Sequence, residues 1–201
     1  DTKKKDPFCH IRCHSSYSLL QSTISVKQLI KKAVEDGVKA VGLTDHGNLF
    51  GAFEFLSLCE KNHITPMLGC EFYLVENYKK RQFTRENKDK RFSQVLYAKN
   101  KNGYNNLCKI SSHGYIDGLY NGFPRIDKSL IQEYKSDLIA TTSGIYGEIS
   151  QLIIEGNSVK AKECFLWWLN EFKDDFYIEL SRNGVEDEDE VNKILLSWAR
   201  E

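Results

Sequence analysis

The sequence predicts an α/β fold, and three of its features carry that prediction. Short segments rich in strand formers alternate with segments whose apolar residues recur at the helical period, and the connections between them are short. With 201 residues, 41% hydrophobic and 12% aromatic, the chain can bury one sizeable core, so we expect a single domain over residues 1–201. Repeated strand and helix units predict a parallel sheet with helices outside it, either an open doubly wound sheet or a closed barrel.

Each predicted element rests on the local choice of residues. Strands are predicted where strand formers cluster, at 8–14, 38–44, 64–75, 92–99, 137–142 and 176–181. Helices are predicted where apolar residues lie on one face, at 26–37, 49–62, 104–115, 147–155, 158–172 and 187–201. Ser25 is expected to cap the first helix. The predicted helix 158–172 contains an aromatic group, Phe165, Trp167, Trp168 and Phe172. Its helical spacing favours a core position over a partner-docking patch.

Charge and composition exclude several classes of protein. Lys+Arg and Asp+Glu each number 28, so no global field draws the chain to nucleic acid, and any such contact must be local. The sequence has no apolar stretch of about 18 residues and no signal peptide pattern, which predicts a cytoplasmic protein without a membrane span. Six cysteines without a C-x-x-C pair are expected to be reduced, buried thiols.

One segment, 79–91, is strongly basic and contains few apolar residues. It is expected to form an exposed loop between the third and fourth predicted strands. Its lysines and arginines could contact phosphate groups, with Lys79, Lys80 and Arg81 as the candidates. We favour the alternative, a solvated hairpin, because runs of charge usually mark solvent-exposed faces.

Imidazoles and carboxylates lie near the ends of the first three predicted strands. His10, Arg12 and His14 share one face of the first strand, because side chains alternate along a strand. Asp45 and His46 end the second strand and Glu71 lies in the third, so a parallel sheet could gather these side chains. Histidines and carboxylates together are the ligands of hydrolytic metal sites. A structural role for each histidine remains an equal alternative on the pattern alone.

Several segments in order carry a resemblance to a known family. They are 10–18, 42–51, 66–71, 102–107, 124–127 and 143–148, and they resemble the polymerase and histidinol phosphatase (PHP) domain of the bacterial DNA polymerase III alpha subunit. The resemblance implies a distorted seven-stranded β/α barrel, in which active members bind metal ions and hydrolyse phosphoesters or proofread DNA. It also implies that the chain is an N-terminal piece of a much longer polymerase, with the last barrel strands beyond residue 201.

The resemblance extends to the metal ligands only in part. His14, His46 and Glu71, with Asp45 beside them, match the ligand motifs of active members. Other ligand positions are replaced, by Arg12, Gln21, Ser93 and Asn183 and by a residue near Gly144. A guanidinium cannot ligate a metal ion, so we expect Arg12 to pair with Glu71 or Asp45 in place of the ion. The site is therefore expected to be vestigial, holding no metal or one weakly bound Zn²⁺ or Mn²⁺.

These observations lead to one functional expectation and two rivals. The leading expectation is a non-catalytic domain, with no catalytic residue of its own, that supports the polymerase chain or docks a proofreading exonuclease subunit. The first rival is a metal-dependent 3′–5′ exonuclease or phosphoesterase, and the second is a free-standing phosphatase of the histidinol phosphatase type. Nucleotidyl transfer would use Mg²⁺ and DNA in other parts of the parent chain. Strand edges left open by missing barrel strands also suggest a dimer.

Overall fold

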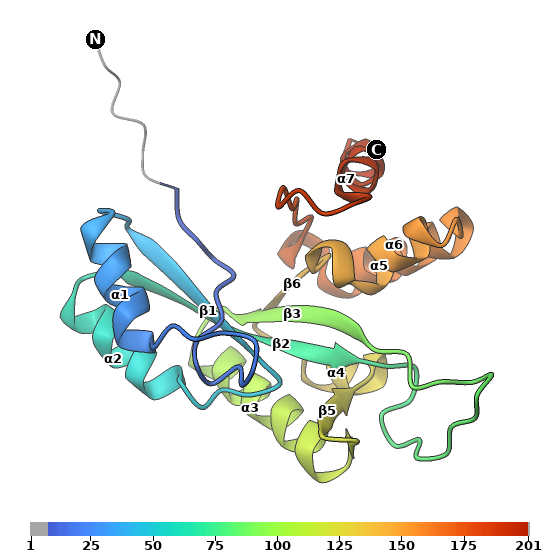
Figure 1. The fold of residues 1–201 in the computed structure, drawn as a ribbon, viewed down its shortest axis with the longest axis horizontal. Helices are drawn as coiled ribbons and strands as arrows, with labels where there is room; N and C mark the ends of the chain where they lie inside the picture. Colours follow the sequence, from blue (N-terminus) through green and yellow to red (C-terminus); the bar gives the residue numbers. More distant parts are fainter. Residues whose placement is uncertain (1–7, 201) are drawn as a thin grey trace. The chain divides into compact units, whose positions relative to one another are not determined.

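The structure, a computed structural model, describes residues 8–200 as alternating helices and strands (Figure 1). Contacts divide the chain into two compact units, Asp1–Glu71 and Phe72–Glu201. The predicted α/β class is confirmed, and the described residues form a seven-stranded sheet with seven α-helices. The single domain over residues 1–201 and the barrel strands beyond residue 201 stay predictions. No helix in the described residues has the length and apolar character needed to cross a membrane.

The first unit is a βαβ arrangement preceded by a helix. Its elements are α1 (Val26–Glu35), β1 (Ala40–His46), α2 (Ala52–Lys61) and the first residues of β2 (Thr65–Leu74). The predicted N-cap is confirmed, because the Ser25 hydroxyl accepts from the Gln28 backbone N–H and the Gln28 side chain accepts from the Ser25 N–H. β1 and β2 pair in parallel from Ala40↔Thr65 to His46↔Glu71. Their buried residues, with those of α1 and α2, form the core of this unit: Val26, Ile30, Val41, Leu43, Phe55, Cys59 and Leu68.

The predicted strand at residues 8–14 is wrong, although the chain does run beside β1. The Gly42 N–H donates to the His10 carbonyl and the Thr44 N–H to the Cys13 carbonyl, each at 2.8 Å. Between these two bonds, two residue steps along β1 correspond to three steps along the N-terminal segment, and this extra residue interrupts the regular ladder as a bulge does. The segment is therefore attached to the sheet without being a strand of it.

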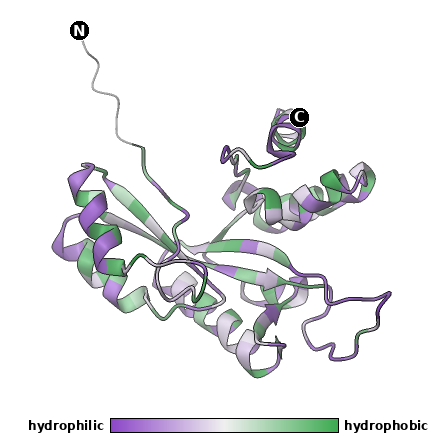
Figure 2. Cartoon of the chain, viewed as in Figure 1, coloured by the Kyte–Doolittle hydropathy of each residue, from purple (hydrophilic) through white to green (hydrophobic). Residues whose placement is uncertain are grey.

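The second unit contains the remaining strands and five helices. Its strands are β3 (Phe92–Ala98), β4 (Leu119–Tyr120), β5 (Phe123–Ile126), β6 (Leu138–Thr141) and β7 (Phe176–Tyr177). Its helices are α3 (Lys101–Ile116), α4 (Lys128–Tyr134), α5 (Glu148–Ile154), α6 (Ser158–Phe172) and α7 (Glu188–Trp198). The sheet follows the order β4-β5-β2-β3-β6-β7, with β1 also pairing with β2. Figure 2 shows hydrophobic residues along strands and on one side of helices, as a sheet covered by helices requires.

The expectation of an entirely parallel sheet is wrong in this unit. β3 pairs with β6 in the antiparallel sense, and β4 pairs with β5 as a hairpin. The described residues between β2 and β3 contain no helix, so no crossover fixes the direction of β3. The β4–β5 hairpin was not predicted, although Asn121-Gly122 at its turn, with φ of 48° and 82°, is a strong hairpin signal. α4 was missed as well.

The aromatic group of α6 forms part of the core, as predicted. Trp168 is 1% exposed and stacks on Phe172 and Phe176, while Phe165 is buried and contacts Phe176 and Trp198. Trp167 is half-buried beside Trp168. Burial of rings this large contributes a substantial share of the stability of the second unit.

Replacing Gly42 by alanine is expected to destabilise the first unit, because the new Cβ would lie 1.6 Å from the Ile11 carbonyl oxygen. The N-terminal segment must then move away from β1, at a cost of about 2 kcal/mol or more. Urea unfolding measures this loss. Gly37→Asn is the control, since Gly37 has a φ of +66° with no atom within 4 Å of its Cβ position and asparagine tolerates that backbone. Equal losses in the two variants would contradict the tight packing of residues 10–13 on β1.

Candidate functional site: a glutamate shared by two histidines and an arginine

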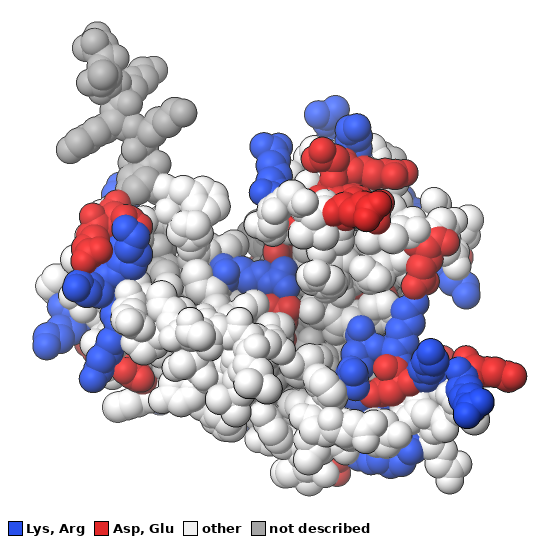
Figure 3. Space-filling model, viewed as in Figure 1, with Lys and Arg blue, Asp and Glu red and all other residues white. Residues whose placement is uncertain are grey.

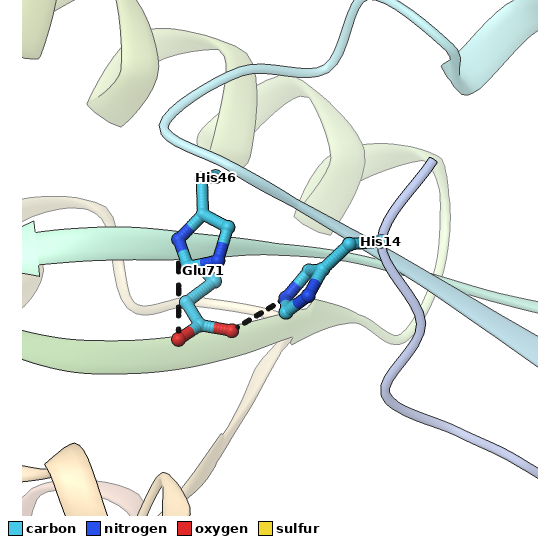
Figure 4. A group of neighbouring side chains, drawn as sticks. All are labelled: His14, His46 and Glu71. Carbon is cyan, nitrogen blue, oxygen red and sulfur yellow. Dashed lines mark hydrogen bonds and ion pairs between the residues drawn. The ribbon is translucent and has the colours of Figure 1, made fainter. Parts of the chain in front are cut away.

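Three segments of the first unit bring the candidate residues together. Arg12 and His14 lie on the N-terminal segment attached to β1. His46 is the last residue of β1, and the parallel register places it directly beside Glu71 of β2. Figure 4 shows the two imidazoles approaching the Glu71 carboxylate from these different segments. The predicted convergence of Arg12, His14, His46 and Glu71 is thus observed.

The two histidines and the glutamate form a compact group of metal-ligating side chains. His14 Nε2 lies 2.7 Å from Glu71 Oε2, and His46 Nδ1 lies 4.0 Å from Glu71 Oε1. The imidazole centroids are 4.3 Å apart. One ligand atom from each of the three residues lies within 4.8 Å of the other two. Among the described residues, these three side chains form a group that could hold a metal ion. Two imidazoles and one carboxylate match the ligand set of catalytic zinc sites.

Arg12 already binds both carboxylate oxygens of this group. Its Nε donates to Glu71 Oε2 at 3.0 Å and its Nη2 to Glu71 Oε1 at 2.6 Å, while Glu71 is 2% exposed. A two-pronged guanidinium–carboxylate contact is among the strongest hydrogen-bonded ion pairs. A divalent ion bound at Glu71 would meet a fixed positive charge at the same oxygens. The side chains present therefore do not fit a metal ion while Arg12 holds this position.

The surroundings of Glu71 and His46 set their protonation. Burial would raise the pKa of Glu71, but hydrogen bonds from His14 and Arg12 and the nearby charges of Arg12 and His46 outweigh it and hold that pKa well below its usual range. Burial lowers the pKa of His46, against the attraction of Glu71 and together with the charges of His14 and Arg12. The site is thus built around a glutamate that stays ionised and a histidine that favours its neutral form.

Asp45 has a different role from the one expected of it. Its Oδ1 accepts from the Ser15 N–H at 2.6 Å and the Ser18 hydroxyl at 2.7 Å, and its Oδ2 accepts from the Ser15 hydroxyl at 2.7 Å. The Ser18 hydroxyl also accepts from the His46 N–H. Asp45 is 2% exposed and organises the chain that follows His14. Arg12 thus pairs with Glu71, whereas the Asp45 carboxylate accepts hydrogen bonds from Ser15 and Ser18.

The other replaced positions lie outside this group of contacts. Gln21 is exposed on the loop after His14, and its N–H donates to the Ser18 carbonyl. Ser93 and Asn183 belong to the second unit. Ser93 is half-buried in β3, and Asn183 donates from its backbone and side chain to Glu188. Gly144, in a 3₁₀ turn, has a φ of 63°. Their correspondence to lost ligands stays a prediction.

The cysteines are free thiols, but only part of the prediction about them is right. Cys59, Cys70 and Cys164 are buried, whereas Cys9, Cys13 and Cys108 are half-exposed. Burial raises the pKa of Cys13 and Cys59 to about 11. Burial, with Glu148 nearby, raises that of Cys164 to about 12. Thiols with such pKa values are poor nucleophiles and poor metal ligands at neutral pH.

The described residues form an α/β domain in which two histidines and a glutamate are grouped and an arginine binds both oxygens of the glutamate carboxylate. The PHP domain family matches residues 10–183, and the chain belongs to this family. It is 39% identical over 197 residues to the DNA polymerase III subunit alpha of Borreliella burgdorferi and 38% identical over 183 residues to that of Chlamydia muridarum. These alignments cover 96% and 89% of this chain but 17% and 14% of the relatives. The chain thus spans about a sixth of the length of the curated relatives it matches.

A solved structure shares the fold at low sequence identity. It is described as a metal-dependent phosphoesterase of Bifidobacterium adolescentis, with a TM-score of 0.55 and 13% identity. The similarity covers 96% of this chain and 82% of that protein. It supports the predicted fold and, at this identity, the fold alone.

The depressed pKa of Glu71 makes folding stability depend on pH with a known sign. A lowered folded-state pKa contributes stability above the ordinary value of 4.5 and loses it as the pH falls below that value. Between pH 5 and pH 3 this group is expected to account for about 2 kcal/mol of the lost free energy of unfolding. Urea unfolding across this range, compared with Glu71→Gln, isolates the contribution. Parallel curves for the two proteins would show that Glu71 titrates normally.

Proposed function

We propose that this chain is a non-catalytic PHP domain within a replicative DNA polymerase III alpha chain. Two facts support the proposal: the family match, and identities of 33–39% to polymerase III alpha subunits across nearly the whole chain. On this proposal, the domain stabilises the polymerase, works in the cytoplasm, and takes no part in nucleotidyl transfer. That reaction would use Mg²⁺ bound by other parts of the longer protein.

The observation that carries the non-catalytic assignment is the pair between Arg12 and Glu71. A buried carboxylate without a cation is costly, and in an active site of this type the metal ion would be that cation. Here the guanidinium binds both oxygens, with His14 as a further donor to Glu71 Oε2. The Arg12 guanidinium therefore takes the place of a metal ion, but it cannot activate a water molecule as a metal ion does. The fold keeps its electrostatic balance and loses the Lewis acid.

The proposed partners follow from the same assignment. The remaining polymerase chain is the first, since the relatives are about six times longer than this chain. A proofreading exonuclease subunit is the second, because a polymerase whose own PHP domain is inactive needs its editing activity from elsewhere. A dimer through the strands that end the sheet path, β4 and β7, is the third.

A second candidate function is a metal-dependent 3′–5′ exonuclease or phosphoesterase. The specific observation in its favour is the retained group of His14, His46 and Glu71. It would require one Zn²⁺ or Mn²⁺ to enter, with Arg12 turned away from the carboxylate. The two candidates therefore differ in the metal content of the purified protein.

Metal content, measured by elemental analysis after purification with Zn²⁺ and Mn²⁺ supplied, tests the proposal. The parent protein is expected to hold almost no metal, and Arg12→His about one ion per chain, because the variant exchanges the competing cation for a ligand. Arg12→Met is the control, since it removes the guanidinium without adding a ligand.

The same three proteins are assayed for hydrolysis of 3′-labelled DNA. Two or more tightly held ions in the parent, with 3′–5′ hydrolysis that a chelator abolishes, would overturn the proposal in favour of the exonuclease. A parent free of metal and of hydrolysis supports it, whatever Arg12→His gains.

A further inference from the structure

The loop between β2 and β3 concentrates positive charge in a chain of zero net charge. Residues 79–91 contain seven lysines and arginines and two acidic residues, an excess of five positive charges. In Figure 1 this segment projects from the end of β2, and Figure 3 shows blue side chains gathered over it. An excess of this size on thirteen residues creates a strong local field.

Most of the cations on this loop are not neutralised by the protein. Arg91 and the buried Arg125 share Asp89, and Lys90 pairs with Glu155. Within the part of the chain that the structure describes, no carboxylate lies in ion-pair range of the remaining cations, Lys79, Lys80, Arg81, Arg85 and Lys88. Five positive charges of the loop therefore have no carboxylate partner within the described residues.

The loop is also held in place from beneath by Arg125, which is fully buried. Arg125 Nη2 donates to the carbonyls of Tyr78 at 3.1 Å and Lys80 at 2.6 Å, its Nη1 donates to Asp89 at 2.9 Å, and its Nε donates to the Gly118 carbonyl at 3.0 Å. One side chain of β5 thus ties the two ends of the loop together. A charged surface ordered in advance loses less conformational entropy when it binds a ligand.

The tip of the loop is ordered as well. The Thr84 N–H donates to the Asn87 carbonyl at 3.1 Å, and the Asn87 N–H donates to the Thr84 hydroxyl at 3.0 Å. Arg85 lies within this closed turn and Lys88 directly follows it, and both are exposed. The cations therefore lie along the loop in a fixed order and not on a mobile tail.

The aromatic residue of the loop narrows the class of ligand. Phe83 is half-buried, with its ring 4.9 Å from that of Tyr120 and with Lys80 and Arg125 near its face. A ring engaged in this way is not a platform for an unpaired base, which single-strand binders provide. The loop also lacks the exposed Trp, Phe and Leu side chains with which basic segments enter a membrane surface. Backbone phosphates presented in a regular array fit these features best.

We propose that the 79–91 loop binds the phosphate backbone of duplex DNA without reading its sequence, through Lys79, Lys80, Arg85 and Lys88. The Arg81 guanidinium instead donates to the backbone carbonyls of Tyr78, Lys80 and Asp117. This surface and its ligand are separate from the cluster at Glu71, so the proposal stands whether or not that cluster binds metal. Such contacts position a protein on DNA and make its affinity depend on salt.

The test is fluorescence anisotropy of a labelled DNA duplex of random sequence, titrated with the protein from about 50 to 200 mM salt. The variant replaces Lys79, Lys80, Arg85 and Lys88 with glutamine. The matched control replaces four exposed lysines elsewhere, Lys27, Lys61, Lys160 and Lys193, and so has the same net charge. Thermal unfolding establishes that both proteins are folded.

The loop variant is expected to bind at least about tenfold more weakly at the lowest salt, and its plot of log affinity against log salt to be shallower by about 3. The control should keep most of the affinity and slope of the parent. Equal weakening in both variants would overturn the proposal, because net charge and not the loop would then explain binding. Tighter binding to single-stranded DNA, or binding only to phosphatidylserine vesicles, would also overturn it.

Discussion

The carboxylate of Glu71 is the group on which the first unit depends. The register of β1 and β2 fixes its place, and the strands leave it 2% exposed, so a cation must accompany it inside the protein. Arg12 meets that need only if the N-terminal segment stays along β1, and the bonds from Gly42 and Thr44 keep it there. The electrostatic demand of one side chain thus determines the path of a segment that has no regular secondary structure.

Asp45 supports the same arrangement from the other side of His14. It binds Ser15 and Ser18, and Ser18 in turn accepts from the backbone of His46. The segments that carry the two histidines are therefore joined by a hydrogen-bonded network next to the Glu71 pair. Because a buried network is stable only when each member is satisfied, it fixes where His14 and His46 lie. That rigidity explains how a ligand-like geometry persists around an arginine.

Much of this structure follows from local sequence, and the parts that do not have identifiable causes. Ser25 and Gln28 form their cap from residues three apart, so the pattern predicted α1. The pairing of Arg12 followed from chemistry, because a guanidinium among ligand residues needs a carboxylate. The role of Asp45 depends on how the chain after His14 turns back, which is a tertiary contact. The path of residues 8–14 depends on Gly42, because the absence of a side chain there lets Ile11 approach β1 closely. A glycine inside a predicted strand was the sequence signal of this close approach.

Arg125 shows that arginine serves the second unit in a related but distinct way. It is completely buried, and its guanidinium donates to three carbonyls and one carboxylate. These hydrogen bonds hold the loop in its conformation. The Arg12 guanidinium neutralises the Glu71 carboxylate. The Arg125 guanidinium instead positions a loop most of whose surface cations have no carboxylate partner within the described residues. Cations that are held in position at the surface without a carboxylate partner can attract an anionic ligand from solution. The buried ion pair at Glu71 and the exposed cations of the loop therefore depend on different arginines, Arg12 and Arg125.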